Sequence, residues 1–174
     1  MGRKSVKADK NIYQTSREEA GMTRAQASEA LGFISESRIE KYENNKDTSP
    51  HPDEVLEMAK VYKKPSLCNY YCSHECVIGR EYIPEVKFSG LEQIVLKMLA
   101  SMNSLERAKD RLIDITADGE IVDDELMDFA KIENGVEEIS MAAEALNLWV
   151  KNTIASGKID SEKLEEARAQ VKKS

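Results

Sequence analysis

Apolar positions recur at helical spacing over most of the chain, but their period differs between the two halves. Up to residue 66, apolar residues fall three and four apart in short runs that Gly or Pro interrupts. From residue 89 onward they recur by sevens in two much longer runs. This pattern predicts an all-α protein, in which a domain of five short helices precedes a long, coiled-coil-like antiparallel helical hairpin.

Two short helices separated by a sharp corner are predicted between residues 23 and 44. Thr23 can cap the first helix with its side-chain oxygen, and Gly32 can end it because glycine readily adopts a positive φ. Ser35 can cap the second helix in the same way as Thr23. The apolar spacing predicts these inward residues: Ala27, Ala30 and Leu31 in the first helix, Ile39 and Tyr42 in the second. A helix-turn-helix presents its second helix to the DNA major groove with this spacing.

These residues resemble the Cro and lambda-repressor type of helix-turn-helix, also called the xenobiotic response element family. The resemblance covers about residues 9 to 66 and places a first helix over residues 11 to 20. Gly21-Met22-Thr23 is similar to the family's Gly-Leu-Thr entry to helix two. Lys41-Tyr42-Glu43-Asn44-Asn45 is similar to its Lys-Ile-Glu-Asn-Gly exit from the recognition helix. The sequence departs from the family at Phe33-Ile34, where one apolar residue is usual, and at Arg24, where the family generally has Gln.

The resemblance implies a sequence-specific DNA-binding transcriptional regulator, a dimeric repressor that reads double-stranded DNA with the helix from about Ser35 to Asn44. The residues predicted to face DNA are Arg17, Thr23, Arg24, Ser35, Glu36, Ser37, Arg38, Lys41 and Asn44. Glu36 and Glu40 would be repelled by phosphates, unless a carboxylate accepts a hydrogen bond from a cytosine amino group. An alternative therefore stays open, a protein-interaction or sensor module whose hairpin binds a partner and whose helix-turn-helix has little DNA affinity.

The net charge of -7 is unevenly distributed between the two halves of the chain. Residues 1 to 66 hold twelve Lys and Arg against eleven Asp and Glu, and residues 67 to 174 hold thirteen against twenty-one. Residues 1 to 8 include Arg3, Lys4 and Lys7 and are predicted to form a flexible basic arm, which could contact phosphates or serve only as a solubilising leader. The acidic second half could bind a protein partner.

All three cysteines fall in a connector predicted over residues 67 to 88. If Pro65 opens a helix there, the three thiols share one face of it: Cys68, Cys72 and Cys76. Zinc, an iron–sulfur centre and a redox switch are possible roles, but His74 lies across the helix from the thiols and cannot complete a zinc site. Free cysteines usually pack as small buried hydrophobic residues. Packing is therefore favoured, and neither a metal nor a cofactor is predicted.

Two heptad patterns predict a helical hairpin over residues 89 to 156. In the first helix the two apolar series are Leu91, Met98, Leu105 and Leu112, and Ile94, Ser101, Ala108 and Ile115. In the second they are Phe129, Val136, Ala143 and Val150, and Ile132, Ile139, Leu146 and Thr153. Further apolar residues widen both stripes: Val95, Met102, Met141, Leu148 and Trp149. This surplus predicts a homodimer through the hairpin, and a last charged helix is predicted over residues 157 to 174.

The turn of this hairpin partly resembles the calcium-binding loop of an EF-hand. Asp114, Asp118 and Glu125 stand at loop positions 1, 5 and 12, and a glycine stands at position 6. Thr116 and Val122 do not suit positions 3 and 9, so a tight turn without calcium is the favoured interpretation.

The sequence also argues against two broad classes of protein. It has no stretch of about 18 apolar residues and no apolar core near its N-terminus, so we expect a cytoplasmic protein without a membrane span. It has two histidines, His51 and His74, and no phosphate-binding glycine loop or nucleophile motif. We therefore do not expect an enzyme.

Overall fold

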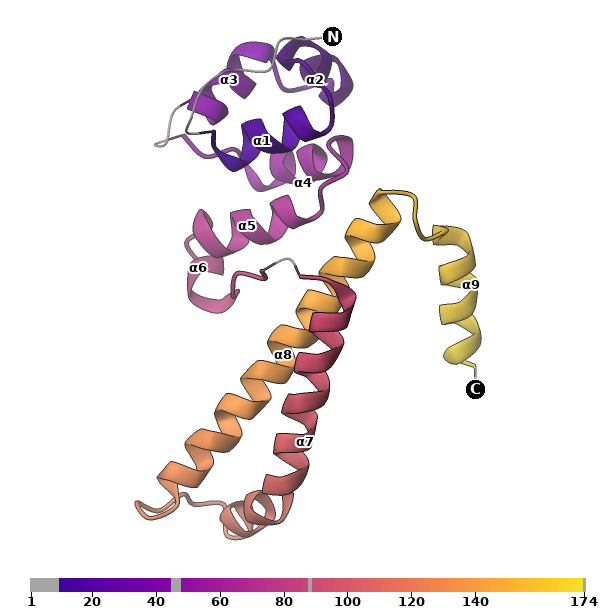
Figure 1. Ribbon diagram of the computed structural model, residues 1–174. Helices are drawn as coiled ribbons and strands as arrows, with labels where there is room; N and C mark the ends of the chain where they lie inside the picture. The colour runs from indigo at the N-terminus through magenta and orange to yellow at the C-terminus, as the bar shows by residue number, and fades with distance from the viewer. Residues whose placement is uncertain (1–9, 45–47, 88, 174) are drawn as a thin grey trace. The chain divides into compact units, whose positions relative to one another are not determined.

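The computed structural model describes residues 10–44, 48–87 and 89–173 (Figure 1). The helices of this described part are α1 (Ile12–Glu19), α2 (Arg24–Leu31), α3 (Glu36–Asn44), α4 (Pro52–Val61), α5 (Ser66–His74), α6 (Gly79–Tyr82), α7 (Leu91–Thr116), α8 (Leu126–Ala155) and α9 (Ser161–Val171). No strand occurs in these ranges, which confirms the predicted all-α class. The predicted basic arm over residues 1 to 8 and Asn45 lie outside the described residues.

The chain divides into two compact units. One comprises Met1–Glu85 with Val150–Ser174, and the other comprises Val86–Trp149. The first unit contains the short helices α1 to α6, and the second contains α7 and most of α8. Each unit is described separately below.

Side-chain caps define the ends of the short helices α2 and α3. Thr23 Oγ1 accepts a hydrogen bond from the backbone N–H of Gln26, and Gln26 Oε1 accepts one from the N–H of Thr23. Gly32 follows α2 with a φ of 74°, and Ser35 Oγ accepts from the N–H of Arg38. The predicted caps at Thr23 and Ser35 and the predicted glycine stop are confirmed, because each satisfies helix-end groups that have no partner within the helix.

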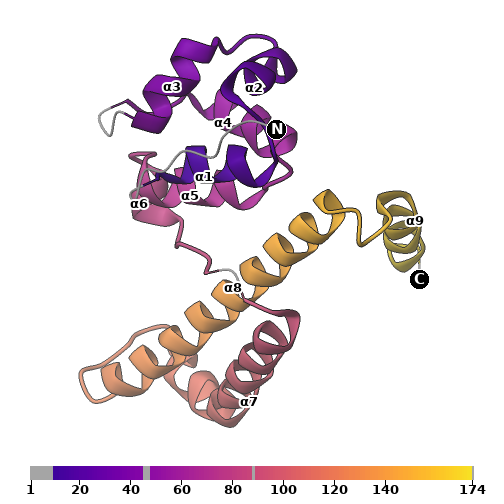
Figure 2. The same cartoon turned by 45° about the horizontal axis from the view of Figure 1, so that its top comes forward.

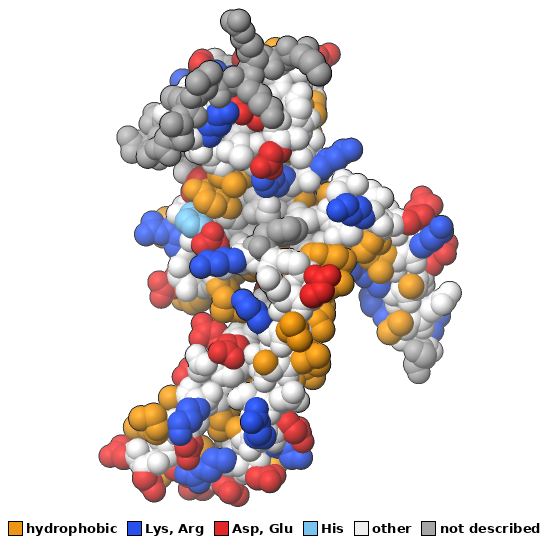
Figure 3. All heavy atoms as spheres, viewed as in Figure 1, with side chains coloured by type: hydrophobic (Ala, Val, Ile, Leu, Met, Phe, Trp, Pro, Cys, Tyr) orange, Lys and Arg blue, Asp and Glu red, His pale blue; other side chains and the backbone are white. Residues whose placement is uncertain are grey.

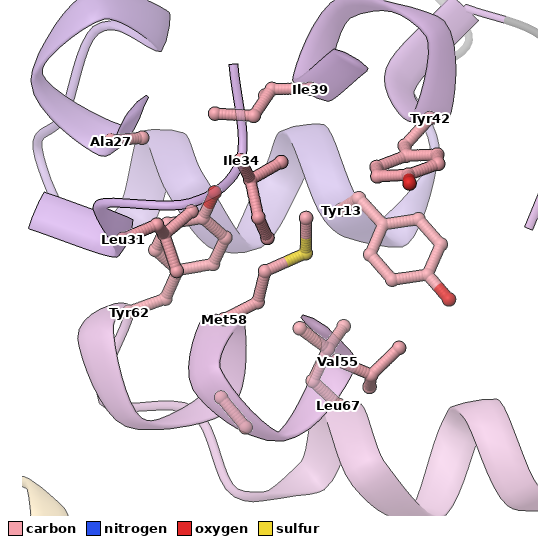
Figure 4. Close-up of a cluster of buried hydrophobic side chains, with 11 residues drawn as sticks. Tyr13, Ala27, Leu31, Ile34, Ile39, Tyr42, Val55, Met58, Tyr62 and Leu67 are labelled. Atoms are coloured by element: carbon pink, nitrogen blue, oxygen red, sulfur yellow. The ribbon is translucent and has the colours of Figure 1, made fainter. Parts of the chain in front are cut away.

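The core of the first unit is an apolar cluster to which α1 to α5 all contribute. Met58 of α4 points into the middle of this cluster, toward Ile34 of the corner between α2 and α3 (Figure 4). The buried residues of the cluster are Tyr13, Ala27, Leu31, Ile34, Ile39, Tyr42, Val55, Met58, Ala59, Tyr62 and Leu67. The short helices are thus held by one shared core, since none of them is long enough to be stable alone.

The corner between α2 and α3 accommodates its extra residue by dividing two apolar side chains between core and solvent. Ile34 is buried, whereas Phe33 is 53% exposed. The prediction that Ala30 faces inward is wrong, because Ala30 is exposed. Ala27 and Leu31, four residues apart, define the buried edge of α2, and Ala30 lies about 100° from Leu31 on the open side of the last turn.

The three cysteines do not share one helix face, so that prediction is wrong. Helix α5 ends at His74, and the N–H of Cys76 bonds back to the carbonyl of Tyr71. The chain then turns to bring Gly79 against α5, where a Cβ on Gly79 would lie 2.2 Å from the carbonyl oxygen of Cys72. This close approach requires a glycine at position 79.

Helices α7 and α8 lie side by side and antiparallel in both views (Figures 1 and 2), as the heptad patterns predict. The inward positions of α7 are those predicted, with Ile94, Ser101 and Ile115 buried. On α8 one of the two predicted series is displaced by one residue. Val136 is 52% exposed, and the buried residues are Ile132, Gly135, Ala142 and Leu148.

A small residue, Gly135, lies at the displaced position of α8. A Cβ on Gly135 would lie 3.0 Å from Leu105 Cδ2, so a larger residue there would have to displace the end of the Leu105 side chain. Two polar contacts support the same register. Ser101 Oγ donates to Glu138 Oε2 at 3.1 Å, and Arg111 Nε donates to Asp128 Oδ2 at 3.0 Å.

The last helix, α9, forms where a charged helix was predicted. Asp160 caps it by accepting from the N–H groups of Glu162 and Lys163, and none of its residues is buried. None of the described helices combines the length and apolar character needed to cross a membrane.

Candidate nucleic-acid interface

Helix α3 divides its residues between the domain core and an exposed face. Ile39, Tyr42 and Glu43 are buried, and the residues of the exposed face are Glu36, Ser37, Arg38, Glu40, Lys41 and Asn44. Because α3 has little more than two turns, the exposed residues form one continuous polar surface beside the start of α2.

Glu43 is a buried carboxylate that joins α3 to both α1 and α2. Arg17 Nε lies 2.6 Å from Glu43 Oε1 and Arg17 Nη2 lies 2.9 Å from Oε2, so the pair is bidentate. Their side chains are 7% and 1% exposed. Arg24 Nε also donates to Glu43 Oε2 at 2.8 Å. Hydrogen bonding to Glu43 raises the pKa of Arg17 despite its burial, which keeps the guanidinium charged.

Arg24 extends this network to the surface. Its Nη1 donates to Glu40 Oε1 at 2.9 Å, so one guanidinium lies between a buried and an exposed carboxylate. The charge of Glu40 on the exposed face is therefore partly compensated by Arg24.

Arg38 is engaged by a second buried acid. Its Nε donates to Tyr42 Oη at 2.6 Å, and its Nη2 lies 3.1 Å from Glu54 Oε1. Tyr42 Oη in turn donates to Glu54 Oε2, which also accepts the N–H of His51. Hydrogen bonding to Tyr42 raises the pKa of Arg38, and burial raises the pKa of Tyr42. Glu54 thus links α3 to the N-terminus of α4.

A hollow of about 380 Å³ lies beside the exposed face of α3. Every side chain that lines it within the described residues can donate a hydrogen bond, and no carboxylate lines it there. The lining residues are Ser35, Ser37, Arg38, Lys41, Tyr42, Thr48, Ser49 and His51. Such a surface suits the negatively charged oxygens of a phosphate, which accept hydrogen bonds from hydroxyl, ammonium and guanidinium groups.

The comparison with known families agrees with this geometry. The family described as Helix-turn-helix matches residues 15–66. Residues 15–66 therefore form a helix-turn-helix domain of the Cro and lambda-repressor type, the kind found in DNA-binding regulators. This family is regulatory and generally not enzymatic. Searches of curated proteins and of solved structures gave no match.

The helix-turn-helix domain brings together most of the residues that the sequence predicts to face DNA. Ser35, Ser37, Arg38 and Lys41 line the hollow, and Asn44 is exposed at the end of α3. Glu36 begins α3, beyond the corner that follows α2. Thr23 and Arg24 stand at the start of α2. Arg17 is separate from this surface, because its side chain is buried against Glu43.

Sequence analysis missed the two acids that organise this surface and the polar residues that precede α4. Glu43 and Glu54 each bind arginines, and Thr48, Ser49 and His51 line the hollow. A signal for Glu43 was available, since it lies four residues after the inward Ile39 and therefore on the same side of α3. A carboxylate at an inward position indicates a buried cationic partner.

The cysteines near the helix-turn-helix domain are free thiols. Cys68, Cys72 and Cys76 are each partly buried. Throughout the described ranges, no three or more His, Cys, Asp or Glu side chains are grouped so that they could hold a metal ion. Burial raises the pKa of the Cys68 and Cys72 thiols, which disfavours the thiolate that would bind a metal or react with an oxidant.

We predict slow alkylation of Cys68 and Cys72 in the native protein. Because burial raises both pKa values, the reactive thiolate is scarcer at neutral pH than in free cysteine, and the alkylation rate should rise only at higher pH. Iodoacetamide labelling followed by mass spectrometry of the cysteine peptides measures each rate, with urea-unfolded protein as the control. Native rates equal to those of the unfolded chain would contradict the prediction.

The candidate calcium residues lie at or near the turn between α7 and α8. Asp114 lies in the last turn of α7, and Asp118 Oδ1 accepts from the N–H of Glu120 at 3.1 Å. Glu125 Oε1 lies 3.9 Å from Arg111, and Gly119 adopts a φ of 77°. The Asp118 contact and the positive φ of Gly119 are typical of a bend at an Asp-Gly pair, within the segment that joins α7 to α8.

Proposed function

We propose that this regulator is a sequence-specific, homodimeric repressor that reads the DNA major groove with α3. The observation that carries the proposal is the exposed polar face of α3 beside a hollow lined by hydrogen-bond donors. A face of this kind can contact base edges while the hollow holds a backbone phosphate. A dimer that binds across a promoter can block transcription without a further partner, so repression is the simplest mode of action.

We assign the predicted residues to three roles. Lys41, Ser35 and Ser37 contact phosphate or base edges from the hollow side of α3. Thr23 and Arg24 present the N-terminus of α2 to a second phosphate, where free backbone N–H groups favour an anion. Arg17 and Arg38 are positioning residues, since Arg17 holds Glu43 and Arg38 holds Glu54. Asn44 extends the surface at the end of α3.

Lys41→Ala is expected to weaken binding to all duplexes alike and to lower the slope of log affinity against log salt by about one. Lys41 is exposed beside the hollow, where its ammonium can neutralise one phosphate. Fluorescence anisotropy over a series of salt concentrations measures the slope. Lys60→Ala is the matched control, because Lys60 lies on α4 and pairs with Glu57. An unchanged slope for Lys41→Ala would remove the lysine from the interface.

We propose that residues 89–156 form the dimer interface. Apolar side chains lie open on the hairpin surface (Figure 3), and Leu96, Leu99, Met102 and Val136 are each at least half exposed. A groove of about 340 Å³ between α7 and α8 continues this apolar surface, with Leu105, Leu112, Ile132 and Ile139 in its lining. A second hairpin would cover this surface in a four-helix bundle. Two-fold symmetry would then place two recognition helices on a palindromic site, about 34 Å apart.

One observation favours the alternative of an interaction or sensor module with little DNA affinity. Arg17, Arg24 and Arg38, the three arginines predicted to face DNA, all have carboxylate partners within the domain. Selection from a random duplex pool at several salt concentrations discriminates the two functions. Enrichment of one palindromic motif supports the repressor, and recovery of an unenriched pool supports the interaction module.

A further inference from the structure

The exposed face of α3 has two rows of opposite character. Glu36 and Glu40 lie four residues apart, one turn above the other, and Arg24 of α2 binds Glu40. Ser37 and Lys41 form the parallel row on the side of the hollow. A DNA duplex offers negative phosphates on both sides of the groove and base edges between them. The Ser37 and Lys41 row suits the phosphates, whereas the carboxylates of the acidic row suit hydrogen-bond donors on the base edges.

The two carboxylates of the acidic row differ in their surroundings. Glu40 is held by Arg24 at 2.9 Å, and its charge is compensated within the protein. Glu36 is exposed, and the described residues supply it with neither an ion pair nor a side-chain hydrogen bond. Glu36 also stands in the first turn of α3, the end from which a recognition helix contacts base edges. Glu36 is thus the acid that is available to DNA.

The chemistry of the major groove limits what an ionised carboxylate can bind. A carboxylate only accepts hydrogen bonds, whereas guanine offers two acceptors and thymine offers an acceptor and a methyl group. Adenine offers one amino group beside the N7 acceptor, which would repel the second carboxylate oxygen. Cytosine offers its N4 amino group with no acceptor on its own edge of the groove. Cytosine is therefore the base that an ionised glutamate at this position selects.

We propose that Glu36 determines specificity by accepting a hydrogen bond from the N4 amino group of a cytosine in each operator half-site. This inference rests on the proposed DNA-binding function of α3. Lys41 and the donor-lined hollow hold the neighbouring phosphates, and their attraction offsets the repulsion between Glu36 and the DNA backbone. Arg24 compensates Glu40, so a single carboxylate of the row needs a donor from the DNA.

The test is selection from a random duplex pool with the wild type, Glu36→Gln and Glu40→Gln, followed by affinity measurements on the selected sites. We expect the wild type to select a motif with an invariant cytosine, and replacement of that C·G pair by T·A to weaken binding about 5- to 150-fold. Glu36→Gln should change the preference at that position alone from cytosine to adenine, because an amide can both accept from adenine N6 and donate to N7. Glu40→Gln is the matched control and should keep the cytosine.

Each other outcome overturns a specific part of the proposal. If Glu36→Gln selects the wild-type motif, Glu36 does not read a base, and its charge serves only to stabilise the N-terminus of α3. If Glu40→Gln, rather than Glu36→Gln, shifts the preference, the assignment to Glu36 is wrong. If the wild type enriches no motif, DNA reading by α3 fails, and the cytosine assignment fails with it. Circular dichroism of both variants shows whether they fold like the wild type.

Discussion

Replacement of Glu43 by Ala is expected to lower the free energy of unfolding of the helix-turn-helix domain by about 3 to 5 kcal/mol. The carboxylate of Glu43 is 1% exposed and binds Arg17, whose side chain is 7% exposed. Its removal leaves the guanidinium of Arg17 buried and without a counter-charge, a state that is far less stable than the same group in water. A loss of this size is a large part of the total stability of a small domain.

Urea unfolding followed by circular dichroism measures this loss, and two variants separate its causes. Glu40→Ala removes the exposed acid that shares Arg24 with Glu43, and we expect an effect below about 1 kcal/mol. Arg17→Met combined with Glu43→Leu removes both buried charges and should recover much of the stability. The explanation fails if the double variant is no more stable than Glu43→Ala, or if Glu43→Ala is as stable as the wild type.

Leu99→Glu combined with Met102→Glu is expected to convert the proposed dimer into a monomer and to abolish preferential binding to a two-half-site operator. Both side chains are 52% exposed on α7, so the substitutions cost little within one chain. In a four-helix bundle they would place carboxylates in the apolar interface, where burial of an unpaired charge opposes association. A monomer binds one half-site at a time. It therefore lacks the higher affinity that a dimer obtains when its two domains bind both half-sites together.

Light scattering at tens of micromolar protein measures the oligomeric state, and anisotropy with one-site and two-site duplexes measures the loss of linked binding. Val171→Glu is a suitable control, because Val171 is 74% exposed on α9, outside the hairpin. A wild-type monomer, or a dimer that survives the double substitution, would exclude this interface. Leu148, which the heptad pattern predicts to widen the exposed stripe, is buried and is therefore unsuitable for the test.

The short helices could be predicted because local chemistry determines their ends. Thr23 and Ser35 cap the helices that follow them, and Gly32 adopts the positive φ that ends α2. The face of α7 that packs against α8 was also predicted, since the hydrophobic residues Ile94 and Ile115 lie on it. These signals lie within a few residues of the structure that they determine.

The errors arise where close packing between distant residues decides the structure. Hydrophobic spacing favours Val136 as an inward residue of α8, but the buried residue is its neighbour Gly135, which faces Leu105 of α7. After α5 the chain turns back and brings Gly79 against Cys72, which no helix propensity indicates. Hydrophobicity alone cannot distinguish a seam that needs small residues from one that needs large residues.

The exposed face of the candidate interface could be predicted from helical geometry, but its ion pairs could not. The residues on the outside of α3 follow from the inward positions of Ile39 and Tyr42. Arg17 and Glu43 are 26 residues apart, and their pairing depends on the packing of α1 against α3. Sequence reasoning therefore identified the exposed face of α3 but not the carboxylate partners of the neighbouring arginines.

Some residues of α3 stabilise the domain and others are exposed to the solvent, and this difference affects how new operator preferences can arise. Arg38 and Glu43 are committed to ion pairs in which at least one partner is buried, so a change at either of them also affects folding. Glu36, Ser37 and Lys41 are exposed, and the described structure shows none of them in an ion pair. A duplicated gene, or an engineered library, can therefore vary these three codons and explore new binding sites while the scaffold stays unchanged.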